Sequence, residues 1–198
     1  MGRIFCLMGK SASGKDTIYR HLLENDALHL TPVVTYTTRP IRAGEEDKRT
    51  YCFCTDAQAD RLAADGRVIE MRTYHTVHGD WRYFTADDGQ MDSGNGDLLM
   101  ITTPEAYQNL QRYFGADRVT GLYLRVDDGE RLQRALDRER GQDEPKYAEL
   151  CRRFLADEKD FSEERMRTCT GVHCFENRDL LQTLADVAGF IQGTDRAV

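Results

Sequence analysis

Residues 9–17 have the types and the spacing needed to hold a phosphate group. They read Gly-Lys-Ser-Ala-Ser-Gly-Lys-Asp-Thr and lie between an apolar run at residues 4–8 and a helix-like segment at 18–23. Gly9 and Gly14 allow backbone angles that a β-carbon would penalise, so successive N–H groups can converge on one anion. The amino end of the following helix adds unpaired N–H groups and partial positive charge. The pattern therefore indicates a phosphate-binding loop.

Three side chains of this loop define the chemistry expected there. Lys15 can contact the outer phosphates of a nucleotide, and Thr17 offers a hydroxyl to magnesium. Asp16 stands where Ser or Thr is usual, and its carboxylate can also hold hydrated magnesium. We therefore expect Thr17 and Asp16 to be metal ligands. The alternative is a glycine-rich turn between a buried strand and an amphipathic helix, without any ligand.

A second group of residues could bind another phosphate and a base. Arg39 and Arg42 are three apart in a polar turn, and planar guanidinium groups can fork onto phosphate oxygens. Tyr51 could add a hydroxyl to the same phosphate. Thr35 and Glu70 could contact a base edge, since a carboxylate accepts two adjacent N–H donors such as those of guanine. In the alternative, the turn is a solvated loop whose arginines pair with acidic neighbours, namely Glu45, Glu46 and Asp47.

Strands and helices that alternate along the chain would position these groups. Strand-like segments occur at residues 4–8, 32–37, 50–54, 67–74, 81–85, 98–101, 119–126 and 171–175. Helical segments are expected at residues 18–23, 56–64, 104–113, 129–140, 146–159 and 180–191. This alternation predicts an α/β fold with a parallel sheet covered on both faces. The short strands between residues 37 and 85, with a turn at 78–80, predict an inserted subdomain.

Composition limits the classes of partner. The chain has 198 residues, 40% of them hydrophobic, and a formal net charge of −7, which does not favour an extended surface for nucleic acid. No apolar run reaches the length of a membrane span, and no signal-peptide pattern precedes the first strand. The six cysteines lack paired CxxC spacing, so reduced thiols are expected. We therefore expect a cytoplasmic protein without nucleic-acid or membrane partners.

The order of these motifs resembles the guanylate kinase family. The segment Thr-Thr-Arg-x-x-Arg-x-Gly-Glu at residues 37–45, followed by Tyr51-x-Phe53, is similar to that family's monophosphate-binding segment. Glu70 sits where the family has the glutamate that reads guanine. Residues 132–136 and Arg152-Arg153 resemble the arginine-bearing lid, although this half of the match is loose.

The resemblance implies a single domain over residues 1–198 with three parts. These are a P-loop three-layer α/β/α core with a parallel sheet (1–34, 86–128 and 160–198), a small inserted mixed β/α monophosphate-binding subdomain (35–85) and a helical lid (about 129–159). It also implies phosphoryl transfer from ATP, with Mg²⁺, to a nucleoside monophosphate such as GMP or dGMP.

The resemblance also implies roles for individual residues. ATP would be held by Gly9, Ser11, Ala12, Ser13, Gly14, Lys15, Asp16, Thr17 and Asn177. The acceptor would be held by Thr35, Arg39, Arg42, Glu45, Tyr51, Glu70, Tyr83 and Thr85, the last two standing near the family's Tyr-Gly-Thr. Lid arginines would come from Arg134, Arg138, Arg140 and Arg153. The residues expected to act in catalysis are Lys15, Arg39, Arg42, Arg138 and Arg153.

Other interpretations stay open. Residues 100–103 read Met-Ile-Thr-Thr where the family usually has Asp-x-Asp. This departure leaves room for a P-loop kinase of another phosphorylated acceptor, such as a ribose bisphosphate or another deoxynucleotide, or for a guanylate-kinase-like interaction module. The lid arginines could simply pair with acidic neighbours on a solvated helix face. Nucleotides are the expected partners, and the chain could be a monomer or a homodimer.

Overall fold

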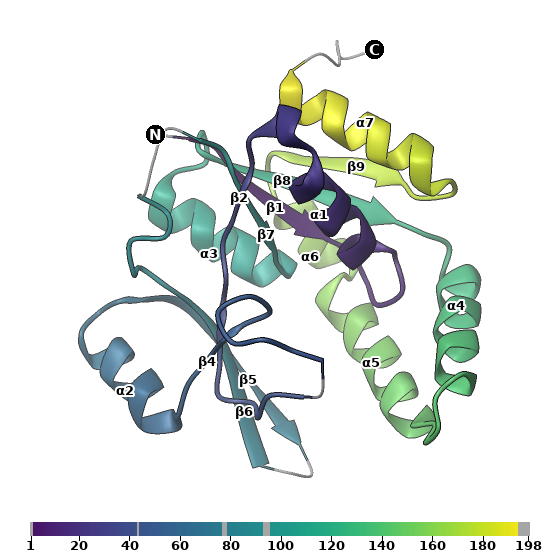
Figure 1. The fold of residues 1–198 in the computed structure, drawn as a ribbon, viewed down its shortest axis with the longest axis horizontal. Helices are drawn as coiled ribbons and strands as arrows, with labels where there is room; N and C mark the ends of the chain where they lie inside the picture. The colour runs from purple at the N-terminus through teal and green to yellow at the C-terminus, as the bar shows by residue number, and fades with distance from the viewer. Residues whose placement is uncertain (1, 43, 77–78, 93–95, 194–198) are drawn as a thin grey trace.

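The computed structural model describes residues 2–42, 44–76, 79–92 and 96–193 (Figure 1). Within these residues, parallel strands form a core sheet in the order β2-β7-β1-β8-β9. The strands are β1 (Ile4–Met8), β2 (Thr31–Pro32), β7 (Leu98–Ile101), β8 (Val119–Arg125) and β9 (Val172–Glu176). The predicted parallel sheet is therefore confirmed.

Helices cover both faces of this sheet (Figure 1). One face packs on α1 (Lys15–Glu24) and α7 (Leu180–Gln192), and the other on α3 (Pro104–Phe114) and α6 (Glu163–Thr168). Alternate residues of β1 serve the two layers. Phe5 and Leu7 belong to the apolar cluster on the α1 and α7 side, whereas Cys6 and Met8 belong to the cluster on the α3 and α6 side. Because every β1 side chain is buried, the strand reads as a continuous apolar run, as expected for a central parallel strand. The three-layer core is confirmed.

A second, mixed sheet forms the inserted subdomain, with strand order β4-β3-β6-β5. Its strands are β3 (Tyr36–Thr37), β4 (Cys52–Phe53), β5 (Val68–Thr76) and β6 (Gly79–Ala86). Helix α2 (Asp56–Ala64) starts at a capping box formed by Thr55 and Gln58. It covers one face of the sheet, where Ala59, Phe84 and Ala86 form a small core. The opposite face carries polar side chains. The expected turn at 78–80 lies partly outside the described residues.

The expected strand at residues 32–37 is wrong as a single element. It is divided between the two sheets, with β2 at the edge of the core and β3 in the subdomain. Between them, Val33 N–H still bonds to Leu99 of the core, whereas the Thr35 carbonyl accepts from Cys52 of the subdomain. The β-forming residues here favour an extended chain, but they do not specify which sheet the chain joins.

Two further helices form the expected lid segment. They are α4 (Asp128–Arg140), which is capped by Asp127, and α5 (Tyr147–Asp160), and they pack side by side (Figure 1). The sequence interpretation missed the 3₁₀ turn η1 (Asp26–Leu28) and helix α6. Among the helices of the described ranges, none combines the length and the apolar character needed to cross a membrane.

Candidate active site

The loop between β1 and α1 has the backbone of an anion cradle. Ala12 and Gly14 are both left-handed, with φ of 62° and 85°. Residues in this conformation turn successive N–H groups toward a common point. A β-carbon at Gly14 would lie 2.7 Å from Asn177 Nδ2, and one at Gly9 would lie 2.5 Å from the side chain of Ser13. Both glycines are therefore needed for space, and Gly14 also for its conformation.

Asn177, which follows the last residue of β9, holds this loop through a hydrogen bond. Its buried amide donates from Nδ2 to the Ser13 carbonyl at 2.7 Å. Its backbone N–H bonds to the Arg125 carbonyl at 2.8 Å, which anchors it to the core sheet. The expected late asparagine thus contacts the loop backbone, so any contribution to nucleotide binding would come through the shape of the loop.

Lys15, Asp16 and Thr17 open helix α1. Lys15 Nζ lies 3.4 Å from Asp16 Oδ2, and the Asp16 side chain is 78% exposed. No cluster of three or more His, Cys, Asp or Glu suited to a metal occurs in the described ranges. Mg²⁺ does not require such a cluster, because it keeps several waters and needs only one or two protein oxygens. A hydroxyl and an exposed carboxylate at the mouth of a phosphate loop fit that ion.

Acidic side chains of the lid contact the phosphate loop directly. The Ser11 N–H donates to Asp157 Oδ2 at 2.7 Å. Lys10 Nζ lies 2.6 Å from Glu158 Oε1 and 3.3 Å from Asp128 Oδ1. Helices α4 and α5 are therefore tied to the loop through charged hydrogen bonds, which are stronger than neutral ones.

Arg131 is the centre of this connection. Its side chain is only 1% exposed, and Nη1 donates to the Ser11 carbonyl at 3.1 Å. Nη2 donates to Asp128 at 2.7 Å and to Glu158 at 3.0 Å. The guanidinium also lies 4.7 Å from the centre of the Phe154 ring. Sequence analysis gave Arg131 no role of its own. Its only distinguishing signal is the four-residue spacing to Ala135, the other buried residue of α4.

The two lid arginines expected in catalysis lie together at the phosphate loop. Arg138 and Arg153 line a small pocket with Ser11, and Arg153 Nη2 lies 3.4 Å from Ser11 Oγ. Neighbouring arginines are engaged elsewhere on the lid. Arg134 pairs with Glu130, Arg140 with Asp137, and Arg152 with Glu149. Ordinary helix-surface pairing thus accounts for Arg134 and Arg140.

In the subdomain, Arg39 is buried and held in a fixed orientation. Its guanidinium forms a bidentate pair with Glu45, with Nη1–Oε2 at 2.9 Å and Nη2–Oε1 at 2.7 Å. Nε donates to the Tyr83 hydroxyl at 3.1 Å, and the rings of Tyr51 and Phe53 lie about it. The hydrogen bond from Arg39 holds the pKa of Glu45 below its ordinary value. The pair is therefore charged at neutral pH.

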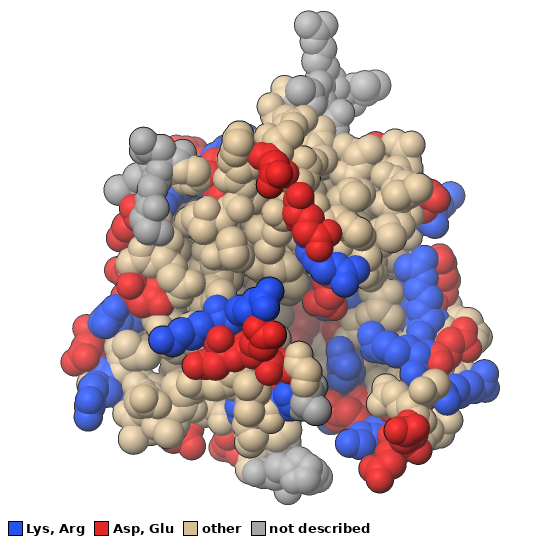
Figure 2. Space-filling model, in the orientation of Figure 1, with Lys and Arg blue, Asp and Glu red and all other residues tan. Residues whose placement is uncertain are grey.

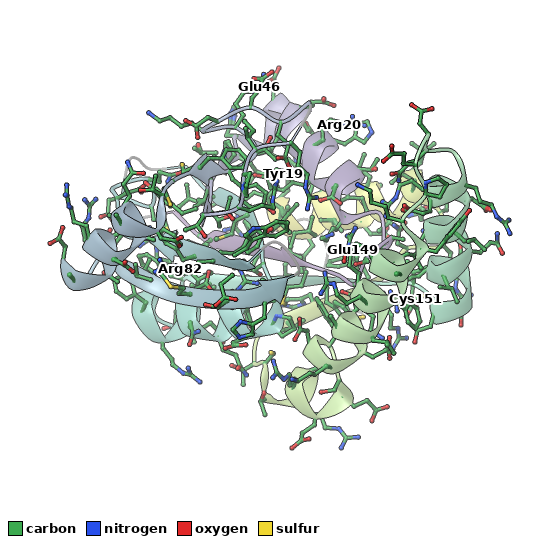
Figure 3. The ribbon with its side chains drawn as sticks, turned by 90° about the horizontal axis from the view of Figure 1, so that it is seen from below. Tyr19, Arg20, Glu46, Arg82, Glu149 and Cys151 are labelled. Atoms are coloured by element: carbon green, nitrogen blue, oxygen red, sulfur yellow. The ribbon has the colours of Figure 1, made fainter. Side chains whose placement is uncertain are left out.

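Arg42 is exposed and lies toward the lid. Its backbone N–H donates to Glu45 Oε2 at 2.8 Å, and its guanidinium lies 5.9 Å from the Trp81 ring centre. Arg152 above all, and also Arg153 and Arg42, lower the pKa of Glu149 on α5. Figure 3 labels Glu149 on α5 and Arg82 on the subdomain, where Arg82 pairs with Asp56 and Asp60 of α2. Figure 2 shows a hollow between the subdomain and the helices α4 and α5, with Lys and Arg along its edges.

Three tyrosine rings of the subdomain lie together near Arg39. Tyr83 makes edge contacts with Tyr51 and Tyr74, at centroid distances of 5.6 and 5.5 Å. Burial raises the pKa of Tyr51, and the nearby charges of Arg39 and Asp16 also act on it. The charge of Asp16 in the phosphate loop therefore acts electrostatically on the acceptor-side tyrosine.

Glu70 lies buried further along the same face of the subdomain sheet. Its Oε1 accepts from Thr85 Oγ1 at 2.8 Å and its Oε2 from Arg72 Nε at 3.1 Å. The strand register explains this, because Glu70 faces Thr85 and Arg72 faces Tyr83 across β5 and β6. Sequence reasoning missed Arg72, since one arginine in a strand gives no sign of its partners. Half-buried Thr35 contributes its carbonyl to the β4 region.

The place of the family's acidic pair is occupied by threonines. Thr102 is buried at the end of β7, and Thr103 caps helix α3. Thr103 Oγ1 also accepts a hydrogen bond of 2.9 Å from Arg72 Nη1. Asp97 is paired with Arg3 at the other end of β7, so it does not substitute for the missing carboxylates.

A phosphate loop on a parallel sheet, a basic acceptor cluster on an inserted subdomain and an arginine-bearing lid define a P-loop nucleoside-monophosphate kinase. Comparison with known proteins identifies the family. The guanylate kinase family model matches residues 1–83. The guanylate kinase of Cupriavidus pinatubonensis is 35% identical over 159 residues, which cover 78% of this chain and 68% of that protein. The guanylate kinase of Nitrosomonas europaea is 26% identical over 193 residues, which cover 97% of this chain and 90% of that protein.

A solved structure shares the fold. The crystal structure of guanylate kinase from Anaplasma phagocytophilum superposes with a TM-score of 0.64, covering 100% of this chain and 88% of that chain at 16% identity. The chain belongs to the guanylate kinase family.

Proposed function

We propose that this chain transfers the γ-phosphoryl group of ATP to GMP or dGMP, giving ADP and GDP or dGDP. An oxygen of the acceptor phosphate forms a bond to the γ-phosphorus, and the bond to the β,γ-bridging oxygen breaks. One observation carries the proposal. The buried Arg39–Glu45 pair fixes a guanidinium beside the Tyr51 ring, and Tyr51 lies within electrostatic range of Asp16 in the phosphate loop, so the two phosphate-binding clusters can serve one site.

On the ATP side, the loop amides and Lys15 are proposed to hold the polyphosphate. Gly9, Ser11, Ala12, Ser13 and Gly14 shape the cradle, which Asn177 supports through Ser13. Lys15 is proposed to stabilise the charge that develops on the transferred group. Thr17 and Asp16 would hold Mg²⁺, which when bound neutralises charge on the β- and γ-phosphates.

On the acceptor side, Arg39, Arg42 and Tyr51 are proposed to bind the phosphate of GMP. Glu45 acts by fixing Arg39, which is pre-organised because Glu45 and Tyr83 already define its orientation. Glu70, with Thr35 and Thr85, is proposed to form the base end of the site. The family resemblance supports this assignment, and so does the position of Glu70 on the same sheet face as Arg39's partner Tyr83.

The lid is proposed to complete the site. Arg138 and Arg153 already lie beside Ser11, so they can neutralise the polyphosphate and exclude water when nucleotides bind. The division into core (1–34, 86–128 and 160–198), subdomain (35–85) and lid (129–159) serves this reaction.

The threonine at position 103 is the observation that favours a second candidate function. Where the family usually has carboxylates this chain has threonines, so a kinase of another phosphorylated acceptor is the alternative. We further propose that nucleotides are the only partners, that the chain acts in the cytoplasm without nucleic acid, and that it is a monomer or a homodimer.

A coupled ADP-release assay tests the proposal. ATP and Mg²⁺ are supplied with GMP, dGMP, AMP, CMP, UMP and dTMP in turn. We expect the wild-type chain to turn over only GMP and dGMP. We expect Glu70→Gln to accept other bases as well. No turnover with any of the six acceptors would overturn the proposal, and ribose bisphosphates would then be tested.

A further inference from the structure

Arg72 lies where the acceptor subdomain meets the core. It sits on β5 two residues after Glu70, on the same sheet face, with its side chain 19% exposed. Nε donates to Glu70 Oε2 at 3.1 Å, and Nη1 donates to Thr103 Oγ1 at 2.9 Å. These two contacts come from different parts of the fold, so they fix the plane of the guanidinium.

The remaining N–H groups of Arg72 are available to a ligand. Arginine carries five N–H donors, and these two bonds use only two. Nη2 has no hydrogen-bond acceptor among the residues that the structure describes. Arg72 also lines a cavity of about 310 Å³ together with Thr103 and Asp160. A volume of this size is at the lower end of the range for small-molecule sites.

The pairing of Arg72 with Glu70 matches the two edges of guanine. A carboxylate accepts the N1–H and the N2 amino group, and an ionised carboxylate has about four acceptor positions, of which Glu70 uses two here. A guanidinium donates to O6 and N7 in the commonest arginine–guanine contact. Adenine presents an amino group where guanine has O6, so Arg72 would reject it.

We propose that Arg72 is a specificity-determining residue that donates hydrogen bonds to O6 and N7 of the acceptor guanine, beside Glu70. This inference rests on the proposed function, because it names how the same acceptor site reads its base. Thr103 holds the guanidinium in place, which gives a role to the threonine that stands where the family has an acid.

The test compares GMP with analogues that alter one edge of the base. 7-Deaza-GMP lacks N7, 6-thio-GMP weakens the acceptor at position 6, and IMP lacks only the amino group that Glu70 would read. The variant is Arg72→Lys, which keeps a cation beside Glu70 but not the planar fork. Arg72→Met is the second variant, used only if it folds, since it leaves the Glu70 charge unpaired.

The wild-type chain should prefer GMP over 7-deaza-GMP and over 6-thio-GMP by about tenfold in kcat/KM. In Arg72→Lys both preferences should fall to about twofold or less, while the preference for GMP over IMP persists. Arg67→Lys is the matched control, because Arg67 immediately precedes the same strand but is exposed and bonds to the Asp87 carbonyl. Arg67→Lys should keep the wild-type preference for GMP over 7-deaza-GMP, 6-thio-GMP and IMP.

Two results would overturn the inference. One is a wild-type chain that does not distinguish GMP from the N7 and O6 analogues. The other is an Arg72→Lys variant that retains both preferences. If no nucleotide turns over, the proposed function fails. Titration calorimetry with GMP and its analogues, without ATP, then tests the inference separately, because the same preferences should appear as ratios of Kd. Absence of GMP binding would then overturn both.

Discussion

The Asp157 carboxylate accepts a hydrogen bond of 2.7 Å from the backbone N–H of Ser11. A lid side chain therefore occupies a donor of the phosphate loop, which is the kind of group that a nucleotide phosphate would use. The lid contacts the loop through acids and through the basic side chains of Arg131 and Arg153. Nucleotide binding must therefore exchange some of these contacts.

Asp157→Ala should bind ATP more tightly, by about threefold to tenfold in Kd, because it removes both a competitor for the Ser11 amide and a negative charge beside the triphosphate. Titration calorimetry with ATP and Mg²⁺ measures this. Asp137→Ala is the control, since Asp137 lies exposed on α4 beside Arg140. An unchanged or weaker affinity in Asp157→Ala would show that the contact does not compete with phosphate.

Arg131→Met should lower the free energy of unfolding by about 1–3 kcal/mol, because it removes the buried guanidinium that bonds Asp157 and the half-exposed Asp128 and Glu158. Urea unfolding measures the loss. Arg134→Met, which breaks only an i,i+4 pair with Glu130 on the lid surface, should cost about 0.5 kcal/mol or less. Equal losses in the two variants would contradict the central position given to Arg131.

Gly14→Ala should weaken ATP binding by at least about tenfold, since the new β-carbon meets Asn177 and the left-handed backbone carries a penalty of about 1–2 kcal/mol. Gly115→Ala is a matched control. Gly115 has φ of 88° but open space around its β-carbon position, so its variant should lose stability without losing ATP affinity. If both variants bind ATP like the wild type, the loop does not depend on this glycine.

The Arg39–Glu45 pair predicts a dependence of stability on acid. The pKa of Glu45 is lowered in the folded chain, chiefly by Arg39, so the unfolded chain binds the proton more readily. The contribution of the pair is fully present above the ordinary glutamate pKa near 4.5 and is lost as pH falls through the lowered value. Urea unfolding should therefore show wild type more stable than Glu45→Gln at pH 7, with the difference shrinking below pH 4.5. A difference that is constant with pH would contradict this.

Much of the core could be predicted from the sequence because its signals are local. The apolar run at 4–8, the glycine loop and the capping residues each specify a strand, a turn or a helix end without help from distant residues. The strand at 32–37 was wrong as a single strand because the assignment of an extended segment to one sheet or another depends on its partners. Here these are Leu99 in the core and Cys52 in the subdomain.

The site was predictable where family motifs or phosphate chemistry marked it, and not where burial changed the role of a charge. Arg39 and Glu45 stand six residues apart and were both named. Arg131 and Arg72 were not assigned, because their partners Glu158 and Thr103 lie 27 and 31 residues away along the chain. An arginine that looks exposed in the sequence becomes a structural or specificity residue only when the fold brings those partners to it.

The most direct test of the central claim follows the phosphoryl group itself. Wild type and Lys15→Met are incubated with γ-³²P-labelled ATP, Mg²⁺ and GMP, and the nucleotides are separated. Label should appear in GDP with wild type, and none should appear when AMP replaces GMP. Lys15→Met, shown to be folded by circular dichroism, should transfer at least about a hundredfold more slowly. Label released only as inorganic phosphate, or equal transfer by Lys15→Met, would contradict the central claim.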